Sequence, residues 1–215
     1  MKNKYFLFAL IIMICCFNFV KVSGIDKPLI GKVIYLDPGH GGLDPGATYK
    51  DIKESDINLS ICLNLREKLE YAGATVYLTR EGDYDLSSIK ARRRKKSDFN
   101  NRIKLINDSK ADMYISIHLN STNSQTWSGM QIFYDKVNDN NKVIAEYLTN
   151  YLKLDRKAQQ IRNMYLNKNI KIPGILIEAG FLSNSYDRQR LISPEYQDEI
   201  ANQIVKAIIN YYNKS

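Results

Sequence analysis

Short apolar segments alternate with amphipathic ones along residues 30–212 of this chain. Short apolar runs bounded by polar residues are typical of buried strands, whereas apolar residues three and four positions apart are typical of helices. The pattern predicts six strands, at Lys32–Asp37, Thr75–Thr79, Asp112–His118, Met130–Tyr134, Asn163–Leu166 and Gly174–Glu178.

Four helices are predicted between and after these strands, at Glu54–Tyr71, Ser97–Asn107, Val143–Leu154 and Pro194–Tyr212. Strands that alternate with helices indicate an α/β fold with a mostly parallel sheet. We therefore expect a single domain with a six-stranded, mostly parallel sheet and helices on both faces. A composition of 44% hydrophobic and 25% charged residues excludes a disordered or fibrous chain.

The first 24 residues differ from the rest. Lys2 and Lys4 precede an apolar run, residues 5–20, and small residues follow up to Gly24. This order is typical of a secretory signal peptide. The run of 16 residues is shorter than the ~20 that span a bilayer as a helix, so we expect cleavage after Gly24, with an uncleaved membrane anchor through residues 5–20 as the alternative. Either way, residues 25–215 form the working domain and are exported.

Charge and cysteine content add limits on partners and stability. The formal net charge of +8 falls to +5 beyond the leader, because residues 1–24 hold three lysines and no acid. We expect the densest basic segment, Arg92–Lys96, to be a solvated loop; the second interpretation is a contact for an anionic surface or partner. Export argues against nucleic-acid binding. Cys62 is the one cysteine beyond the leader and is expected in the core.

The chain has only two histidines, and each closes a predicted strand or the turn after it. His40 lies in the glycine-rich turn Pro38–Gly42, where glycines allow positive φ and close approach of a ligand. His118 ends a strand and, alone, reads equally well as a metal ligand or a hydrogen-bonded core histidine. Because ligands of open α/β sheets bind at the carboxyl ends of the strands, the two histidines together indicate a metal site. Zinc prefers imidazole ligands and keeps one position open in catalytic sites.

A carboxylate has to supply the third ligand. Glu54, which opens the first long helix, is the best candidate, with Asp44 and Asp37 as alternatives. Glu178 follows four apolar or glycine residues. A buried carboxylate is costly unless it is paired, protonated or close to a cation. We interpret Glu178 as a general base beside a metal in preference to a structural ion pair.

Several ordered motifs closely resemble those of the zinc-dependent N-acetylmuramoyl-L-alanine amidases. They are Ile34–Gly42 (IYLDPGHGG), Ser116–Asn120 (SIHLN) and Ile177–Asn184 (IEAGFLSN), supported by Glu54, Arg102 and Asn107 at positions that match the family. The resemblance covers about residues 30–212, nearly the whole predicted mature domain.

The resemblance implies an activity and roles for residues. Enzymes of this family cut the amide bond between N-acetylmuramic acid and the L-alanine of the peptidoglycan stem peptide. It implies that one Zn²⁺ is held by His40, Glu54 and His118, and that Glu178 is the catalytic glutamate. Asn120 and Arg80 are expected near the site as substrate-binding residues.

The chain lacks the wall-binding repeats and long inserted regulatory helix of many family members, and so is most similar to the sporulation and germination type. That similarity implies action on spore-cortex peptidoglycan during muramic-δ-lactam formation, in the cell wall or forespore intermembrane space. It also implies a lipoprotein partner, for which the basic segment 92–96 is a candidate contact. The alternatives are a vegetative autolysin or cell-separation amidase, a metallocarboxypeptidase-like enzyme, and a non-catalytic wall-binding protein.

Overall fold

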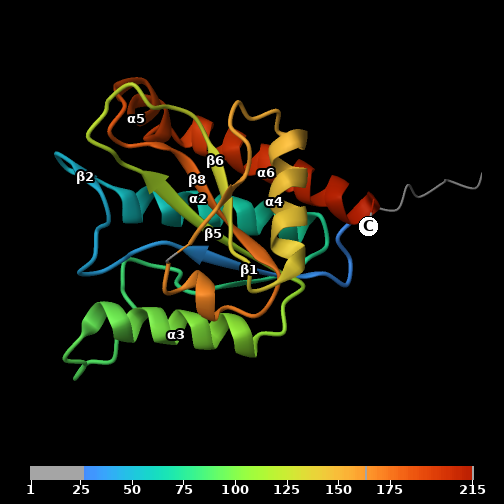
Figure 1. Cartoon of the computed structure of the whole chain (residues 1–215), viewed down its shortest axis with the longest axis horizontal. Helices are drawn as coiled ribbons and strands as arrows, with labels where there is room; N and C mark the ends of the chain where they lie inside the picture. The colour runs from blue at the N-terminus through green and yellow to red at the C-terminus, as the bar shows by residue number, and fades with distance from the viewer. Residues whose placement is uncertain (1–26, 163, 215) are drawn as a thin grey trace, which may run out of the picture.

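A six-stranded sheet forms the centre of the computed structural model, which describes residues 27–162 and 164–214 (Figure 1). The predicted leader, residues 1–24, lies outside the described residues. The strand order is β4-β1-β5-β8-β6-β7, in which β4, β1, β5 and β8 run parallel and β6 runs antiparallel to β8. The strands are β1 (Val33–Pro38), β4 (Thr75–Leu78), β5 (Met113–Asn120), β6 (Gln131–Tyr134), β7 (Gln159–Gln160) and β8 (Gly174–Phe181).

One face of the sheet carries the main core. Alternate residues of the central strands, such as Leu36, Ile115 and Ile177, point to this face and are fully buried. They pack against the apolar sides of α2 (Glu54–Tyr71), α4 (Asp139–Tyr151) and α6 (Pro194–Lys214). Cys62 of α2 is buried in the same cluster, as expected.

The other face is covered by α3 (Arg94–Asp108), which Figure 1 shows across the sheet from α2 and α6. A smaller cluster fills this side, with Tyr35, Tyr114 and Ile106 at its centre. The fold class predicted from the sequence is therefore confirmed, with helices on both faces. At the carboxyl end of the sheet this second face becomes polar, and the candidate site lies there.

One predicted strand, residues 163–166, is wrong: residue 164 has no regular structure, and residues 165–166 form a turn that leads into the 3-10 helix Asn167–Asn169. Leu166 packs against the Tyr35–Tyr114 cluster, and the Asn167 amide donates to the Tyr114 hydroxyl at 3.2 Å. The apolar spacing there reflects this packing, and β7 takes the sheet edge instead.

Short elements were also missed by the sequence patterns. They are the hairpin of β2 (Thr48–Tyr49) and β3 (Ile52–Lys53) and the helix α5 (Ser185–Leu191). In the described part of the chain, none of the helices has the length and apolar content needed to cross a bilayer.

Candidate active site

The turn after β1 presents His40 to the carboxyl end of the sheet. His40 adopts a positive φ of 62°, and Gly41 exchanges backbone hydrogen bonds with Asp44 at 2.8 and 3.1 Å. Gly39 must be a glycine for a steric reason, because a Cβ there would lie 2.2 Å from the His118 ring. The glycine-rich turn therefore lets the chain pass directly against the second histidine.

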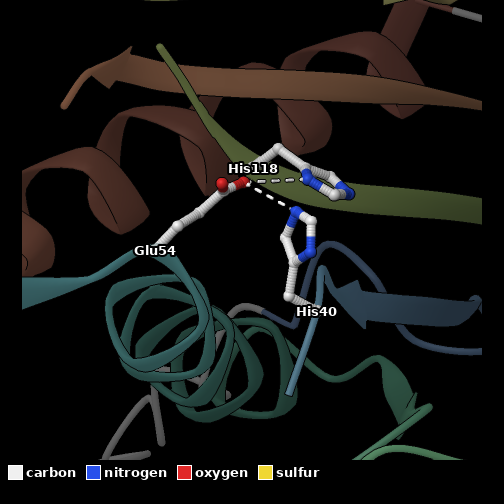
Figure 2. Close-up of side chains that lie close together, drawn as sticks. All are labelled: His40, Glu54 and His118. Atoms are coloured by element: carbon white, nitrogen blue, oxygen red, sulfur yellow. Dashed lines mark hydrogen bonds and ion pairs between the residues drawn. The ribbon is translucent and has the colours of Figure 1, made fainter. Parts of the chain in front are cut away.

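Glu54 contacts both histidines from one side (Figure 2). Its Oε1 atom is 3.2 Å from Nε2 of His40 and 3.0 Å from Nδ1 of His118. Backbone N–H groups hold the carboxylate: Ala47 donates to Oε2 at 2.8 Å and Leu119 donates to Oε1 at 3.1 Å. Burial alone would raise the pKa of Glu54, but the hydrogen bonds to His118 and His40 outweigh it and leave the pKa well below its usual value.

These three side chains form a candidate metal centre. One ligand atom from each of His40, Glu54 and His118 lies within 4.8 Å of the other two. Two imidazole nitrogens and one carboxylate oxygen are a donor set of catalytic zinc sites, which leave a fourth position for water or substrate. The donors present therefore fit zinc in number and in kind.

Asp44 supports His40 from behind. Its Oδ2 atom lies 3.0 Å from Nδ1 of His40, on the side of the ring away from Glu54. Burial lowers the pKa of His40, but the hydrogen bonds to Glu54 and then Asp44 outweigh burial and raise it. A carboxylate on the second ring nitrogen fixes the tautomer and orientation of a ligating histidine. Asp44, one alternative third ligand, thus contacts a histidine and lies outside the cluster of three.

Glu178 stands beside the cluster on the next strand. It pairs in register with His118 across β5 and β8, so both side chains point to the same face of the sheet. Its Oε2 atom is buried without a hydrogen-bond partner among the described residues. Burial raises the pKa of Glu178 to about 7; His118 opposes this rise and Glu54 adds to it. A carboxylate with such a pKa can both accept and release a proton near neutral pH.

A cleft of about 370 Å³ opens over the cluster and Glu178. Lys95 and Phe99 of α3 and Tyr165 of the loop before the 3-10 helix are among the residues that line it. Asn120, expected near substrate, also lines the cleft and donates to the Gln131 side chain at 3.0 Å.

Arg80, the other expected substrate-binding residue, is only 1% exposed and does not line the cleft. It donates to the carbonyls of Pro38, Gly39 and Ser55 at 3.1, 3.0 and 2.8 Å. Arg80 thus lies beneath the His40 turn, where its hydrogen bonds hold the backbone of the turn in place.

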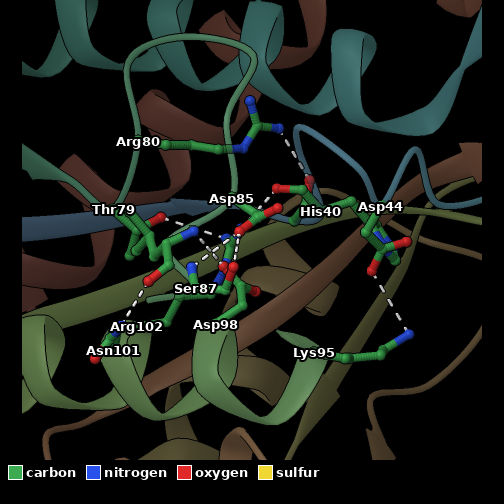
Figure 3. A network of polar contacts seen from close by, with 12 residues as sticks. His40, Asp44, Thr79, Arg80, Asp85, Ser87, Lys95, Asp98, Asn101 and Arg102 are labelled. Atoms are coloured by element: carbon green, nitrogen blue, oxygen red, sulfur yellow. Dashed lines mark hydrogen bonds and ion pairs between the residues drawn. The ribbon is translucent and has the colours of Figure 1, made fainter. Parts of the chain in front are cut away.

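A second arginine holds the same turn from α3 (Figure 3). Arg102 donates to the Asp37 carboxylate at 2.7 Å, to the His40 carbonyl at 2.6 Å and to the Asp98 carboxylate at 2.8 Å. Asp37, the other alternative ligand, is fully committed to this pair and to the hydroxyls of Thr79 and Ser116. From the sequence, Arg102 could be singled out only because it matches the family. Its i,i+4 spacing from Asp98 also indicates an ion pair on one side of a helix.

Fold and site together define an α/β protein with a candidate mononuclear metal centre at the carboxyl ends of parallel strands. Residues 34–210 match the family model of the N-acetylmuramoyl-L-alanine amidases. The chain belongs to this family, as its motifs indicated.

Individual relatives agree with the family. The chain is 42% identical to the germination-specific N-acetylmuramoyl-L-alanine amidase of Bacillus subtilis (strain 168), over all of this chain and 96% of the relative. It resembles the CwlD amidase of Clostridioides difficile, solved in complex with the GerS lipoprotein, with a TM-score of 0.80 and 37% identity over 86% of this chain and 100% of that one. The catalytic domain of the amidase CwlV from Bacillus (Paenibacillus) polymyxa var. colistinus matches with a TM-score of 0.73 and 26% identity, over 85% and 98% of the two chains.

Proposed function

We propose that this chain is a zinc-dependent amidase that separates N-acetylmuramic acid from the L-alanine of the stem peptide in spore-cortex peptidoglycan. The observation that carries the proposal is the His40–Glu54–His118 cluster with Glu178 beside it across β5 and β8. The relative from B. subtilis, named for germination, supports the cortex as the place of action.

His40, Glu54 and His118 would hold the metal. When bound, zinc lowers the pKa of a coordinated water from 15.7 to about 7 and polarises a carbonyl. The Asp44 carboxylate keeps the His40 ring turned toward Glu54.

Glu178 is the residue that moves the proton. As the water oxygen bonds to the lactyl carbonyl carbon, the Glu178 carboxylate accepts the proton of the water. It then passes that proton to the alanine nitrogen as the carbon–nitrogen bond breaks, so the products are a lactyl carboxylic acid and a free amine. The raised pKa of Glu178 suits it to both steps.

Digestion of purified peptidoglycan tests the reaction. The wild-type chain with zinc should release stem peptides that begin at L-alanine, detected by mass spectrometry. Glu178→Gln keeps the shape of the side chain and should lower the rate by about 10²–10⁴-fold, the usual contribution of a general acid–base. Release of carboxy-terminal amino acids would instead identify a carboxypeptidase, and unchanged cleavage by Glu178→Gln would rule out its role as the base.

Metal content and spore chemistry test the rest. The purified protein should hold close to one zinc per chain, and His118→Ala should lose it. Spores that lack the protein should lack muramic-δ-lactam in their cortex. A vegetative autolysin would leave the cortex unchanged and alter cell separation.

We further propose that residues 1–24 direct export, that residues 25–215 are the catalytic domain, and that the enzyme works outside the membrane. The amino-terminal sequence of the mature protein tests cleavage after Gly24. Because the C. difficile relative was solved with a lipoprotein, we propose a lipoprotein partner here as well. Co-purification of the tagged protein from sporulating cells tests it.

A further inference from the structure

A second hollow lies on α3, beside the cleft. This hollow, of about 560 Å³, is lined by four basic side chains and two rings: Arg93, Arg94, Lys95, Lys96, Phe99 and Tyr165. Lys95, Phe99 and Tyr165 also line the cleft over the candidate metal centre. The two hollows therefore adjoin at these three residues, and we call them together the groove; Glu178 lines the first hollow and not the second.

Two aromatic rings line both parts of the groove. Phe99 and Tyr165 stack with ring centroids 6.4 Å apart, and the Lys95 and Lys96 ammonium groups each lie 5.8 Å from one of these rings. The Tyr165 hydroxyl bonds to Asn100 at 2.9 Å, which ties the loop to α3. A stacked aromatic pair beneath cations suits a ligand that combines methylene groups with a negative charge.

The charge of this segment is only partly balanced. Arg94 is committed to Asp85, whose two carboxylate oxygens it meets at 3.0 and 2.8 Å. Lys95 lies 3.6 Å from the Asp44 carboxylate, and 66% of its side chain is exposed. Figure 3 marks this contact with a dashed line. Arg93 is exposed and has no ion pair with an acid among the described residues. An excess of positive charge thus lies in the second hollow, beside the cleft.

We propose that this groove binds the peptide stem of the substrate, and that Lys95 and Arg93 recognise a free carboxylate of the stem. The inference rests on the proposed function. The bond to be cut joins a glycan to a peptide, and the N-acetylated sugars are uncharged, whereas the stem carries carboxylates. The basic groove therefore matches the peptide side of the substrate, and Lys95 is a specificity-determining residue.

The test pairs substrate charge with residue charge. Two kinds of uncrosslinked peptidoglycan strands are used, which differ only at the second stem residue: D-glutamate with a free carboxylate, or D-isoglutamine with a carboxamide. The zinc-loaded full chain is compared with Lys95→Gln, Arg93→Gln and the matched control Lys142→Gln. Lys142 lies on α4, exposed and 3.7 Å from Glu146, so its loss makes the same charge change away from the groove.

We expect KM for the D-glutamate strands to rise about threefold to fivefold in Lys95→Gln and Arg93→Gln, the size of an exposed charge contact. The isoglutamine strands and Lys142→Gln should show no such rise. Any indirect effect of Lys95 on Asp44 would alter both substrates equally, so the ratio between them isolates the carboxylate contact. The preference of the wild type for D-glutamate should fade as salt is raised.

Equal effects on both substrates would overturn the inference. So would an effect seen only with the lipoprotein partner or with walls that carry other anionic polymers, which would make the segment a contact for those molecules. If the wild type cuts neither kind of strand, the proposed function itself fails, and the two failures are therefore distinguishable.

Discussion

Replacing Arg102 with methionine tests how the His40 turn is held. The guanidinium is 1% exposed and forms a buried ion pair with Asp37, also 1% exposed, at 2.7 Å. The same group donates to the carbonyls of Pro38 and His40 at 2.8 and 2.6 Å. Methionine fills much of the same volume but leaves the Asp37 charge and both carbonyls without this donor.

Removing one partner of a buried ion pair costs about 3–5 kcal/mol, out of a total stability of about 5–15 kcal/mol. In a domain of this size each kcal/mol lowers Tm by about 2–4 °C, so we expect a fall of roughly 6–20 °C. Arg102→Lys keeps the charge but lacks the planar guanidinium, so its Tm should lie between those of the wild type and Arg102→Met.

The loss should also depend on pH. Burial raises the pKa of Asp37, but Arg102 and Thr79 outweigh it and hold the pKa below its usual value. A carboxyl with a depressed pKa stabilises the fold above its unfolded pKa of about 3.9, and that contribution fades as pH falls through the folded value. In Arg102→Met the arginine no longer opposes burial, so the pKa of Asp37 is raised. Protonation of Asp37 at low pH then removes its unpaired buried charge, and the variant is less destabilised. The stability gap should therefore narrow from pH 7 to pH 4.5.

Urea unfolding at both pH values, in chelator so that metal does not contribute, measures the gap. The double variant Asp37→Asn with Arg102→Met should be less destabilised than the sum of the single variants by about 0.5–3 kcal/mol. If Arg102→Met lies within about 0.5 kcal/mol of the wild type, or if the two changes add, the ion pair does not hold the turn as described.

Three further outcomes are expected at the site. At pH 8 the metal-free Glu178→Gln variant should be more stable than the metal-free wild type. The folded pKa of Glu178 is raised to about 7, so its ionisation destabilises the wild-type fold increasingly as pH rises from the unfolded pKa to 7. The same pH dependence of the unfolding free energy in urea for both proteins would contradict this. Gly39→Ala should abolish activity, since its Cβ would lie 2.2 Å from the His118 ring, and wild-type turnover would show that the ring can move aside. Asp44→Asn should weaken zinc binding or activity by about 10–100-fold, measured by competition with a chelator; unchanged affinity would exclude an orienting role.

Much of the fold followed from the sequence because β1, β5 and β8 are buried on both faces and read as continuous apolar runs. Helix α2 was predicted with the bounds observed, Glu54–Tyr71, since its apolar side is regular and Gly73 follows it. The predicted strand at 163–166 failed because Leu166 is apolar for packing against the α3 side of the sheet. The β2–β3 hairpin has two residues per strand, too few to show a period.

The candidate site, too, could be predicted only in part from the sequence. His40, His118 and Glu178 could be picked out because each ends or follows a predicted strand, and Glu54 because it opens a predicted helix and matches the family. The roles of Asp44 and Asp37 could not be separated, because both are acids close to His40 and only the turn decides which one faces its ring. The Arg93–Lys96 groove was also beyond reach, because it forms only where α3 meets the distant loop at Tyr165.

The turn at His40 shows why the network under the site matters as much as the metal-binding side chains. A non-glycine residue in the left-handed region is strained by about 1–2 kcal/mol, so His40 keeps its φ of 62° only where other contacts outweigh this strain. Arg102 bonds to its carbonyl, Arg80 bonds to the carbonyl of Gly39 at 3.0 Å, and Asp44 bonds to its ring. Each arginine makes several bonds with one planar group, which a lysine cannot reproduce. A lysine at either position should therefore disturb the placement of His40 although it never touches the substrate.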